Sequence, residues 1–134
     1  MINEEKFMNP QAIINIFGSM PNFTNAELIN VELKRDGPCL FVRLMTKEVV
    51  ENKPKHWGKW DVVYIEMSFI GVQDLLIKNL GTNNIVDQFE ISELNGNGSL
   101  KIKCNNQMQI ECLFDWARIE NITPGLLGSL NWTI

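Results

Sequence analysis

Between residues 88 and 114, apolar and polar side chains alternate almost without interruption, which leaves few folds open to this chain. A period of two residues is that of a β-strand with one buried face. Asn95-Gly96-Asn97-Gly98 and Asn105-Asn106 interrupt the alternation, and Asn and Gly accept the positive φ of tight turns. The pattern therefore predicts a three-stranded antiparallel meander. The side chains expected to face the core are Phe89, Ile91, Leu100, Ile102, Cys104, Met108, Ile110, Cys112 and Phe114.

The other face of this meander carries charges of both signs. Lys101 and Lys103 of the middle strand are expected to lie between Glu90 and Glu111 of its neighbours. Opposite charges on adjacent strands stabilise a sheet by a few tenths of a kcal/mol up to about 1 kcal/mol per pair.

Further strands are predicted on both sides of the meander. Alternation at Ile29, Val31 and Leu33 indicates a half-buried strand, and Asp36-Gly37-Pro38 then turns the chain. Leu40, Val42 and Leu44 belong to a strand that is apolar on most of both faces, which favours a central position. A strand over 60–70 should bury one face, and 118–122 should form a last strand. Residues 71–80 fit either a short strand or one turn of helix. The buried face of 60–70 is expected to hold Val63, Ile65, Met67 and Phe69.

One helix is predicted over residues 10–17. Asn9 can cap it, Pro10 suits its first turn and Gly18 suits its end. Ile13, Ile14 and Phe17 share a face, so the helix should lie across a sheet.

These elements predict an α+β fold that is mostly β. We expect an antiparallel sheet or flattened sandwich of about seven strands, with one N-terminal helix packed on it. The 134 residues, 45% of them apolar, are enough for one core, so residues 1–134 are expected to form a single domain. The uncharged closing segment, 124–134, is expected to be a packed strand or loop.

The charge balance disfavours several partners. Twelve Lys and Arg against 16 Asp and Glu give a net charge of −4, whereas nucleic acids and anionic membranes attract basic proteins. A basic protein partner remains compatible with this charge, but so does a role in solubility alone.

The three cysteines indicate a reducing compartment. Cys39, Cys104 and Cys112 are few, odd in number and widely spaced, so they form neither a disulfide framework nor a cysteine zinc site. We expect buried thiols in a cytoplasmic protein. The chain start lacks the pattern of a signal peptide, and no apolar run is long enough to span a membrane.

Residues suited to catalysis do not cluster in the sequence. His56 lies in a lysine-rich loop, 46–60, with Asp61 as its nearest candidate orienting carboxylate. Gly96-x-Gly98 joins two strands and leads to no helix, so it does not fit a dinucleotide site. We therefore expect no enzyme activity, no metal and no cofactor.

The same loop offers the one candidate binding site. Trp57, Trp60 and Asp61 place aromatic side chains beside a charge, and tryptophans are frequent anchors of protein interfaces. The alternative is that Trp60 starts a buried strand and Trp57 covers the edge of the sheet.

Three stretches, 16–28, 65–75 and 110–124, are similar in order and spacing to the Immunity protein 50 family. The most distinctive is Gly18-x-x-Pro21-x-Phe23. The chain departs from the family pattern at Met20, where Trp is usual, and at Thr24-Asn25, where His-Asp is usual. The resemblance implies a cytoplasmic antidote that binds a cognate bacterial toxin domain, and the acidic balance suits a basic toxin such as a nuclease. The alternative is a β module that binds a small molecule or carbohydrate.

Overall fold

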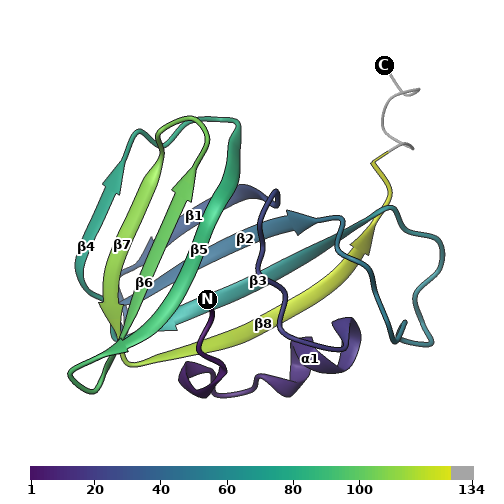
Figure 1. The fold of residues 1–134 in the computed structure, drawn as a ribbon, viewed down its shortest axis with the longest axis horizontal. Coiled ribbons are helices and arrows are strands. Elements are labelled where there is room, and N and C mark those ends of the chain that lie inside the picture. Colours follow the sequence, from purple (N-terminus) through teal and green to yellow (C-terminus); the bar gives the residue numbers. More distant parts are fainter. Residues whose placement is uncertain (128–134) are drawn as a thin grey trace.

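The computed structural model describes residues 1–127, and their strands form one antiparallel sheet (Figure 1). The strand order is β4-β7-β6-β5-β1-β2-β3-β8. About seven strands were expected, and the described sheet has eight. The additional strand is β4, which lies in the segment 71–80, where the sequence fitted either a short strand or a turn of helix. The elements are η1 Glu4–Lys6, α1 Gln11–Phe17, β1 Glu27–Lys34, β2 Cys39–Thr46, β3 Val62–Ile70, β4 Gln73–Lys78, β5 Asn84–Leu94, β6 Asn97–Cys104, β7 Gln109–Phe114 and β8 Trp116–Gly125.

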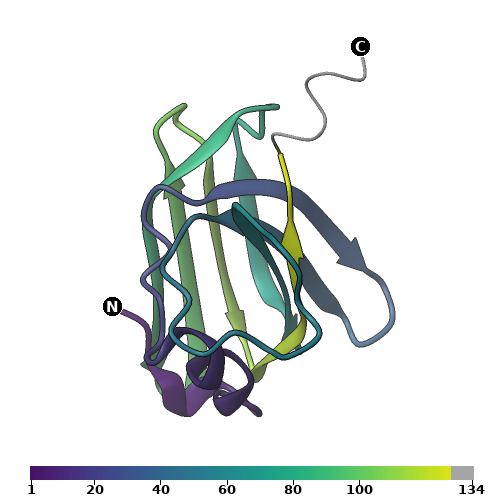
Figure 2. The same ribbon diagram turned by 90° about the vertical axis from the view of Figure 1, so that its right-hand side faces the viewer.

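This sheet folds over on itself into two layers, as Figure 2 shows from the side. The layers β4-β7-β6-β5 and β1-β2-β3-β8 are joined into one sheet where Glu27 and Leu28 of β1 pair with β5, next to backbone bonds of Asn25 and Ala26 with Val86. The core lies between the layers: the rings of Phe69 on β3 and Phe114 on β7 meet with centroids 5.0 Å apart. The structure therefore combines the two expected architectures, because one continuous sheet packs like a sandwich.

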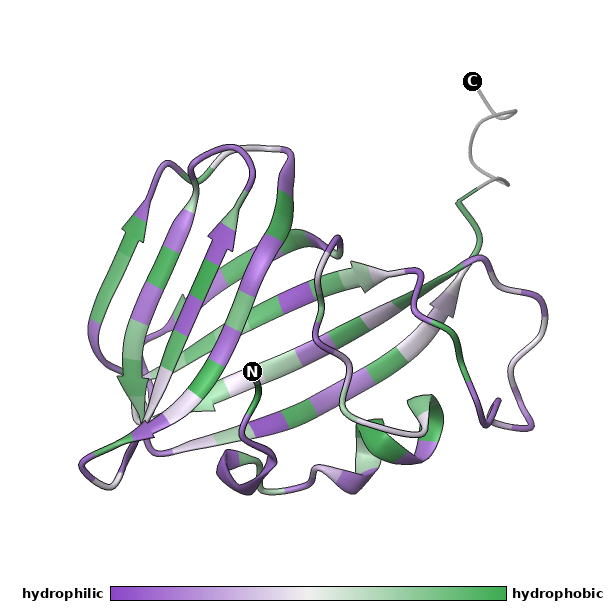
Figure 3. Ribbon diagram, viewed as in Figure 1, coloured by the Kyte–Doolittle hydropathy of each residue, from purple (hydrophilic) through white to green (hydrophobic). Residues whose placement is uncertain are grey.

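The pairing of β5, β6 and β7 confirms the meander predicted from alternation. Hydrophobic and hydrophilic residues alternate along these strands (Figure 3). All nine apolar positions named for the meander are buried. Lys101 lies between Glu90 and Glu111 and forms an ion pair with Glu111 at 3.6 Å. Lys103 was predicted wrongly, because its neighbours are Gln88 and Gln109.

The central strands also follow the prediction. The inward side chains of β2 and β3 are buried almost completely, and β2 lies between β1 and β3. Those side chains are Leu40, Val42, Leu44, Val63, Ile65, Met67 and Phe69.

The prediction for β1 was wrong in its burial. Leu28 is the buried residue of this strand, whereas Ile29 is 38% exposed and Leu33 is 57% exposed. A bulge between Leu28 and Asn30 shifts the register, and β1 pairs with β5 only as far as Leu28. Beyond that point Val31 still packs partly against the core, but Leu33 is left uncovered.

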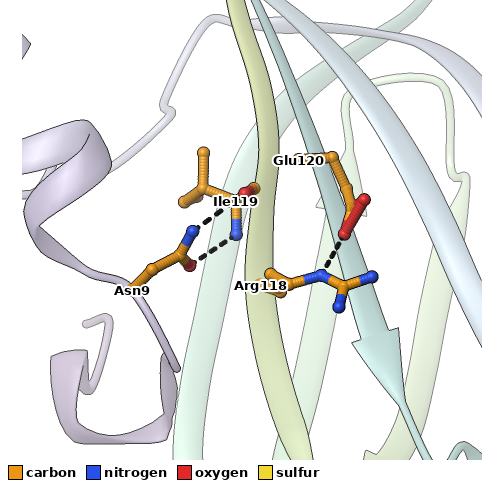
Figure 4. Close-up of polar contacts among 4 residues, drawn as sticks. All are labelled: Asn9, Arg118, Ile119 and Glu120. Atoms are coloured by element: carbon orange, nitrogen blue, oxygen red, sulfur yellow. Dashed lines mark hydrogen bonds and ion pairs between the residues drawn. The ribbon is translucent and has the colours of Figure 1, made fainter.

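Helix α1 lies beside β8 at one end of the two layers (Figure 1). Ile13 and Phe17 are buried, and Gly18 ends the helix at φ +85° with its N–H donating to the Ile14 carbonyl. Asn9 does not cap the helix, since the N-cap is Pro10 and makes no side-chain bond. The Asn9 side chain instead binds the backbone of Ile119: its amide donates to the carbonyl at 3.0 Å, and its oxygen accepts from the N–H at 2.9 Å (Figure 4).

Two expectations concern the end of the chain. The last strand, β8, is longer than the predicted 118–122 and reaches Gly125. Most of the segment 124–134, from residue 128 onward, lies outside the described residues. Within the described part, neither helix is long and apolar enough to cross a membrane.

Candidate partner-binding surface

The lysine-rich loop is held firmly against the body of the protein. The carbonyl of Ile16, in α1, accepts the N–H groups of both Glu51 and Asn52 at 3.0 Å. The Asn52 side chain adds a bond to the carbonyl of Asn15 at 3.0 Å. This docking brings the tryptophans of the loop against the core.

The structure brings Trp57 and Trp60 together but turns Trp57 inward. Their rings meet edge to face with centroids 5.5 Å apart, and Trp57 is only 3% exposed. Trp60 is half-buried and packs against the same core. Asp61 is exposed, and its carboxylate accepts the N–H of Leu127 at 2.9 Å. The ring of Trp57 is therefore part of the core, and only Trp60 and Asp61 of this group reach the surface.

The groups considered for chemistry stay apart. His56 is exposed in the loop, and residues 1–127 contain no group of three or more His, Cys, Asp or Glu side chains placed to hold a metal ion. Burial raises the pKa of Cys112 to about 12. Burial, helped by the charge of Asp87, raises the pKa of Cys104 to about 11. Both thiols are thus protonated near neutral pH and are poor nucleophiles.

Hollows on the described surface include two that have no aromatic residue in their lining. The first, of about 620 Å³, lies beside Thr24 and Asn25. The second, of about 810 Å³, lies between the N-terminal segment and β5. Its walls carry Glu4, Glu5, Glu90 and Glu93. A carbohydrate-binding module would be expected to offer aromatic rings for stacking.

The two outer faces of the folded sheet differ sharply in composition. Because cross-strand partners point to the same side, the register identifies the side chains that face away from the core. On β5, β6 and β7 these are mostly polar, and we call this set the polar face: Gln88, Glu90, Ser92, Ser99, Lys101, Lys103, Gln109 and Glu111, with Leu113 as an apolar member.

The opposite surface, on β2, β3 and β8, is rich in aromatic, sulfur-containing and arginine side chains. We call it the aromatic face. Its members are Cys39, Phe41, Arg43, Met45, Tyr64, Glu66, Ile70, Trp116 and Arg118, and the same side of the sheet also carries the polar residues Ser68, Asn121 and Thr123. Trp116 is 47% exposed. Both described helices lie at the end of the layers beside β8 and β5, so neither covers this face (Figure 2).

Arg43 is the most constrained charged residue of the aromatic face. Its guanidinium carbon lies 4.2 Å from the centre of the Tyr64 ring, and its Nε lies 3.4 Å from a carboxylate oxygen of Glu66. The side chain is nevertheless 36% exposed. Stacking and ion pairing fix the plane of the guanidinium while part of it still faces solvent.

A second arginine lies further along the aromatic face. Arg118 pairs with Glu120 in the bulge of β8 (Figure 4). Each arginine therefore has its own carboxylate.

Sequence reasoning missed the aromatic face because it read the outward residues of the central strand only as a sign of burial. The available signal was the kind of residue at those positions: Phe41, Arg43 and Met45 in one strand and Tyr64 in the next. These residue types are enriched in protein interfaces.

Comparison with known proteins gives one match. The family model described as Immunity protein 50 matches residues 9–125, a range that includes α1 and all eight strands. No curated protein and no solved structure matches the chain.

Proposed function

Because the chain belongs to the Immunity protein 50 family, we propose that it is an immunity protein that binds a cognate bacterial toxin domain and blocks it. The observation that carries this proposal is the family match, which spans most of the chain. In this role the protein acts in the cytoplasm of the bacterium that makes it and protects that cell from a toxin delivered by a competitor.

The aromatic face is the surface we assign to toxin binding. Tyr, Trp and Arg dominate the binding energy of many interfaces, whereas Lys, Glu and Ser are depleted from them. The aromatic face carries Tyr64, Trp116 and two arginines beside its polar members, whereas the polar face carries mainly Lys, Glu, Gln and Ser. A flat sheet surface can also cover a large part of a toxin domain without rearrangement.

The arginines suit burial under a partner. Removing a charged group from water is costly unless it is paired, and Arg43 and Arg118 already pair with Glu66 and Glu120. The guanidinium of Arg43 is also held in place by Tyr64, so little side-chain entropy is lost when a toxin orders it further.

Binding without chemistry fits the distribution of reactive groups. The buried thiols are protonated, and His56 is exposed on a loop outside the aromatic face. Inhibition by covering the toxin needs no reactive group on the immunity protein.

The acidic character of the chain supports a basic toxin. The net charge is −4, and four glutamates surround the hollow beside the N-terminus. A negative field over this part of the molecule would speed the approach of a positively charged partner such as a nuclease.

Protection of a living cell tests the function directly. The proposal predicts a toxin gene immediately upstream, and its toxin domain would be induced in a bacterial host with or without this chain. We expect growth to stop without the chain and to continue with it, and the two purified proteins to form a stable complex. Growth arrest despite ample folded chain, with no complex in solution, would contradict the proposal.

A further inference from the structure

The end of the β1–β2 hairpin projects from the body of the protein (Figure 2). Residues 32–38 are exposed without interruption, although part of this range is strand. Leu33 is 57% exposed, which is unusual for an apolar side chain in a strand.

One edge of this hairpin is unpaired. On the side away from β2, strand β1 pairs with β5 at Glu27 and Leu28 only. Within residues 1–127, no backbone hydrogen bond is made along that side from Ile29 to Lys34. A row of free N–H and C=O groups is a template for another strand.

The other two edges of the sheet are better protected. Along β8, the N–H of Met8 donates to the Ala117 carbonyl at 2.8 Å, and the Asn9 side chain binds Ile119. Strand β4 is short and has an irregular register between Gln73 and Leu76, with Asp74 at φ +55°. Bulges and covering segments of this kind discourage pairing with a further strand.

We propose that the free edge of β1 pairs with the same edge of a second copy of this chain, which forms a symmetric dimer. The proposal goes beyond toxin binding and does not rest on it. Symmetric pairing of two identical strands is antiparallel, and its two-fold axis passes through one residue. That residue is Leu33.

The register centred on Leu33 matches the charges of the strand. It places Glu32 of each copy opposite Lys34 of the other, which makes two ion pairs on one side of the sheet. On the other side the two exposed Leu33 side chains meet at the axis. The pairing covers residues 31–35. Glu32 and Lys34 lie on the side of the aromatic face, where Lys34 Nζ is 5.1 Å from the centre of the Phe41 ring, so the ion pairs border that face.

Neighbouring registers are less favourable. Centring on Glu32 or on Lys34 places two like charges opposite each other. Centring on Val31 brings Lys34 of the second copy beside Leu28, a position that Asn84 of β5 already occupies. The free edge thus has one register that satisfies both charge and space.

A contact of five residues per chain is small, so the dimer should be weak. Interfaces below about 1,200 Å² are typical of transient association, and we expect a dissociation constant on the order of tens of micromolar. Sedimentation velocity of the full chain alone, up to about 500 µM, covers this range.

Charge reversal tests the register without relying on a single variant. Glu32→Lys and Lys34→Glu should each weaken the dimer about tenfold, because each creates two like-charge contacts. In an equimolar mixture of the two variants, every reversed charge faces one of opposite sign, so association should return to the wild-type level. Glu48→Lys and Lys47→Glu make the same charge changes at exposed positions outside the hairpin and should leave the dimer unchanged.

Each alternative outcome overturns the proposal. A wild-type chain that stays monomeric at every concentration would show that the edge takes no second copy and is open to another partner. Single variants that associate like the wild type would place the dimer contact elsewhere. A mixture that fails to recover would contradict the register.

Discussion

At the scale of single residues, Trp57 belongs to the core although it lies in a lysine-rich loop. Its sequence context left open an anchor of an interface and a cover for the edge of the sheet, and the docked loop turns its ring into the core. Lys53 supports this arrangement by donating from Nζ to the Trp57 carbonyl at 3.2 Å. The loop around Trp57 is therefore part of the folded core.

Trp57→Ala should destabilise the fold by about 3–5 kcal/mol, because it removes a large buried side chain. The measurement is the free energy of unfolding in urea. His56→Ala, the adjacent and exposed position, is the control and should change it by less than about 0.5 kcal/mol. Equal stability of the two variants would show that Trp57 is not part of the core.

The buried thiols should make stability fall at alkaline pH. The pKa values of Cys104 and Cys112 are raised in the fold, to about 11 and about 12, above an ordinary value of 9.0. The unfolded chain therefore loses these protons first, so the thiols favour the folded state fully below pH 9, and this contribution declines as the pH rises from 9 through 11–12.

The free energy of unfolding would be measured from pH 7 to 12 for the wild type and for the double variant Cys104→Ala/Cys112→Ala. The double variant should be less stable at neutral pH, and its stability should fall less steeply above pH 9. If the stability of the two proteins fell equally steeply with pH, the raised pKa values of Cys104 and Cys112 would be contradicted.

At the scale of elements, the sequence predicted the register of the meander because that register depends on two local features, the turn residues and the alternation of side chains. Turn residues set where each strand begins, and the period of two sets which side chains face in. Asn95 and Gly96 have φ of +52° and +85°, as the hairpin signal required.

Ile110→Ala should cost about 2–5 kcal/mol of folding free energy, because Ile110 is fully buried on β7. Glu111→Ala, the next residue on the opposite side of the strand, loses only a half-exposed ion pair and should cost about 0.5 kcal/mol. Thermal unfolding of both variants measures the contrast. A larger loss for Glu111→Ala would mean that the register is shifted by one residue.

The elements that sequence reasoning predicted wrongly depend on distant neighbours. Asn9 has the chemistry of a helix cap, but it binds Ile119, a residue 110 positions away. Ile29 and Leu33 alternate as a buried face would, but Ile29 lies in the bulge of β1, and Leu33 lies beyond the part of the strand that pairs with β5. Neither the contact of Asn9 nor the exposure of these two side chains can be predicted from the local sequence.

At the scale of the whole molecule, the folded sheet presents two outer faces that differ in residue type. The candidate site could not be read from the sequence because its members come from three strands separated by loops. Arg43 and Tyr64 meet, and Trp116 comes to lie on the same face, only through the pairing of β2, β3 and β8. The local cluster of Trp57, Trp60 and Asp61 was easier to see, but it has less surface to offer.

The central claim is that the aromatic face binds the cognate toxin domain, and titration calorimetry with that domain tests it most directly. Arg43→Ala/Tyr64→Ala is compared with Lys101→Ala/Gln88→Ala, a matched pair on the polar face, after thermal unfolding has shown that both are folded. We predict that the first pair weakens binding at least about tenfold and that the second changes it less than about twofold. Unchanged affinity for the first pair, or a larger loss for the second, would contradict the account.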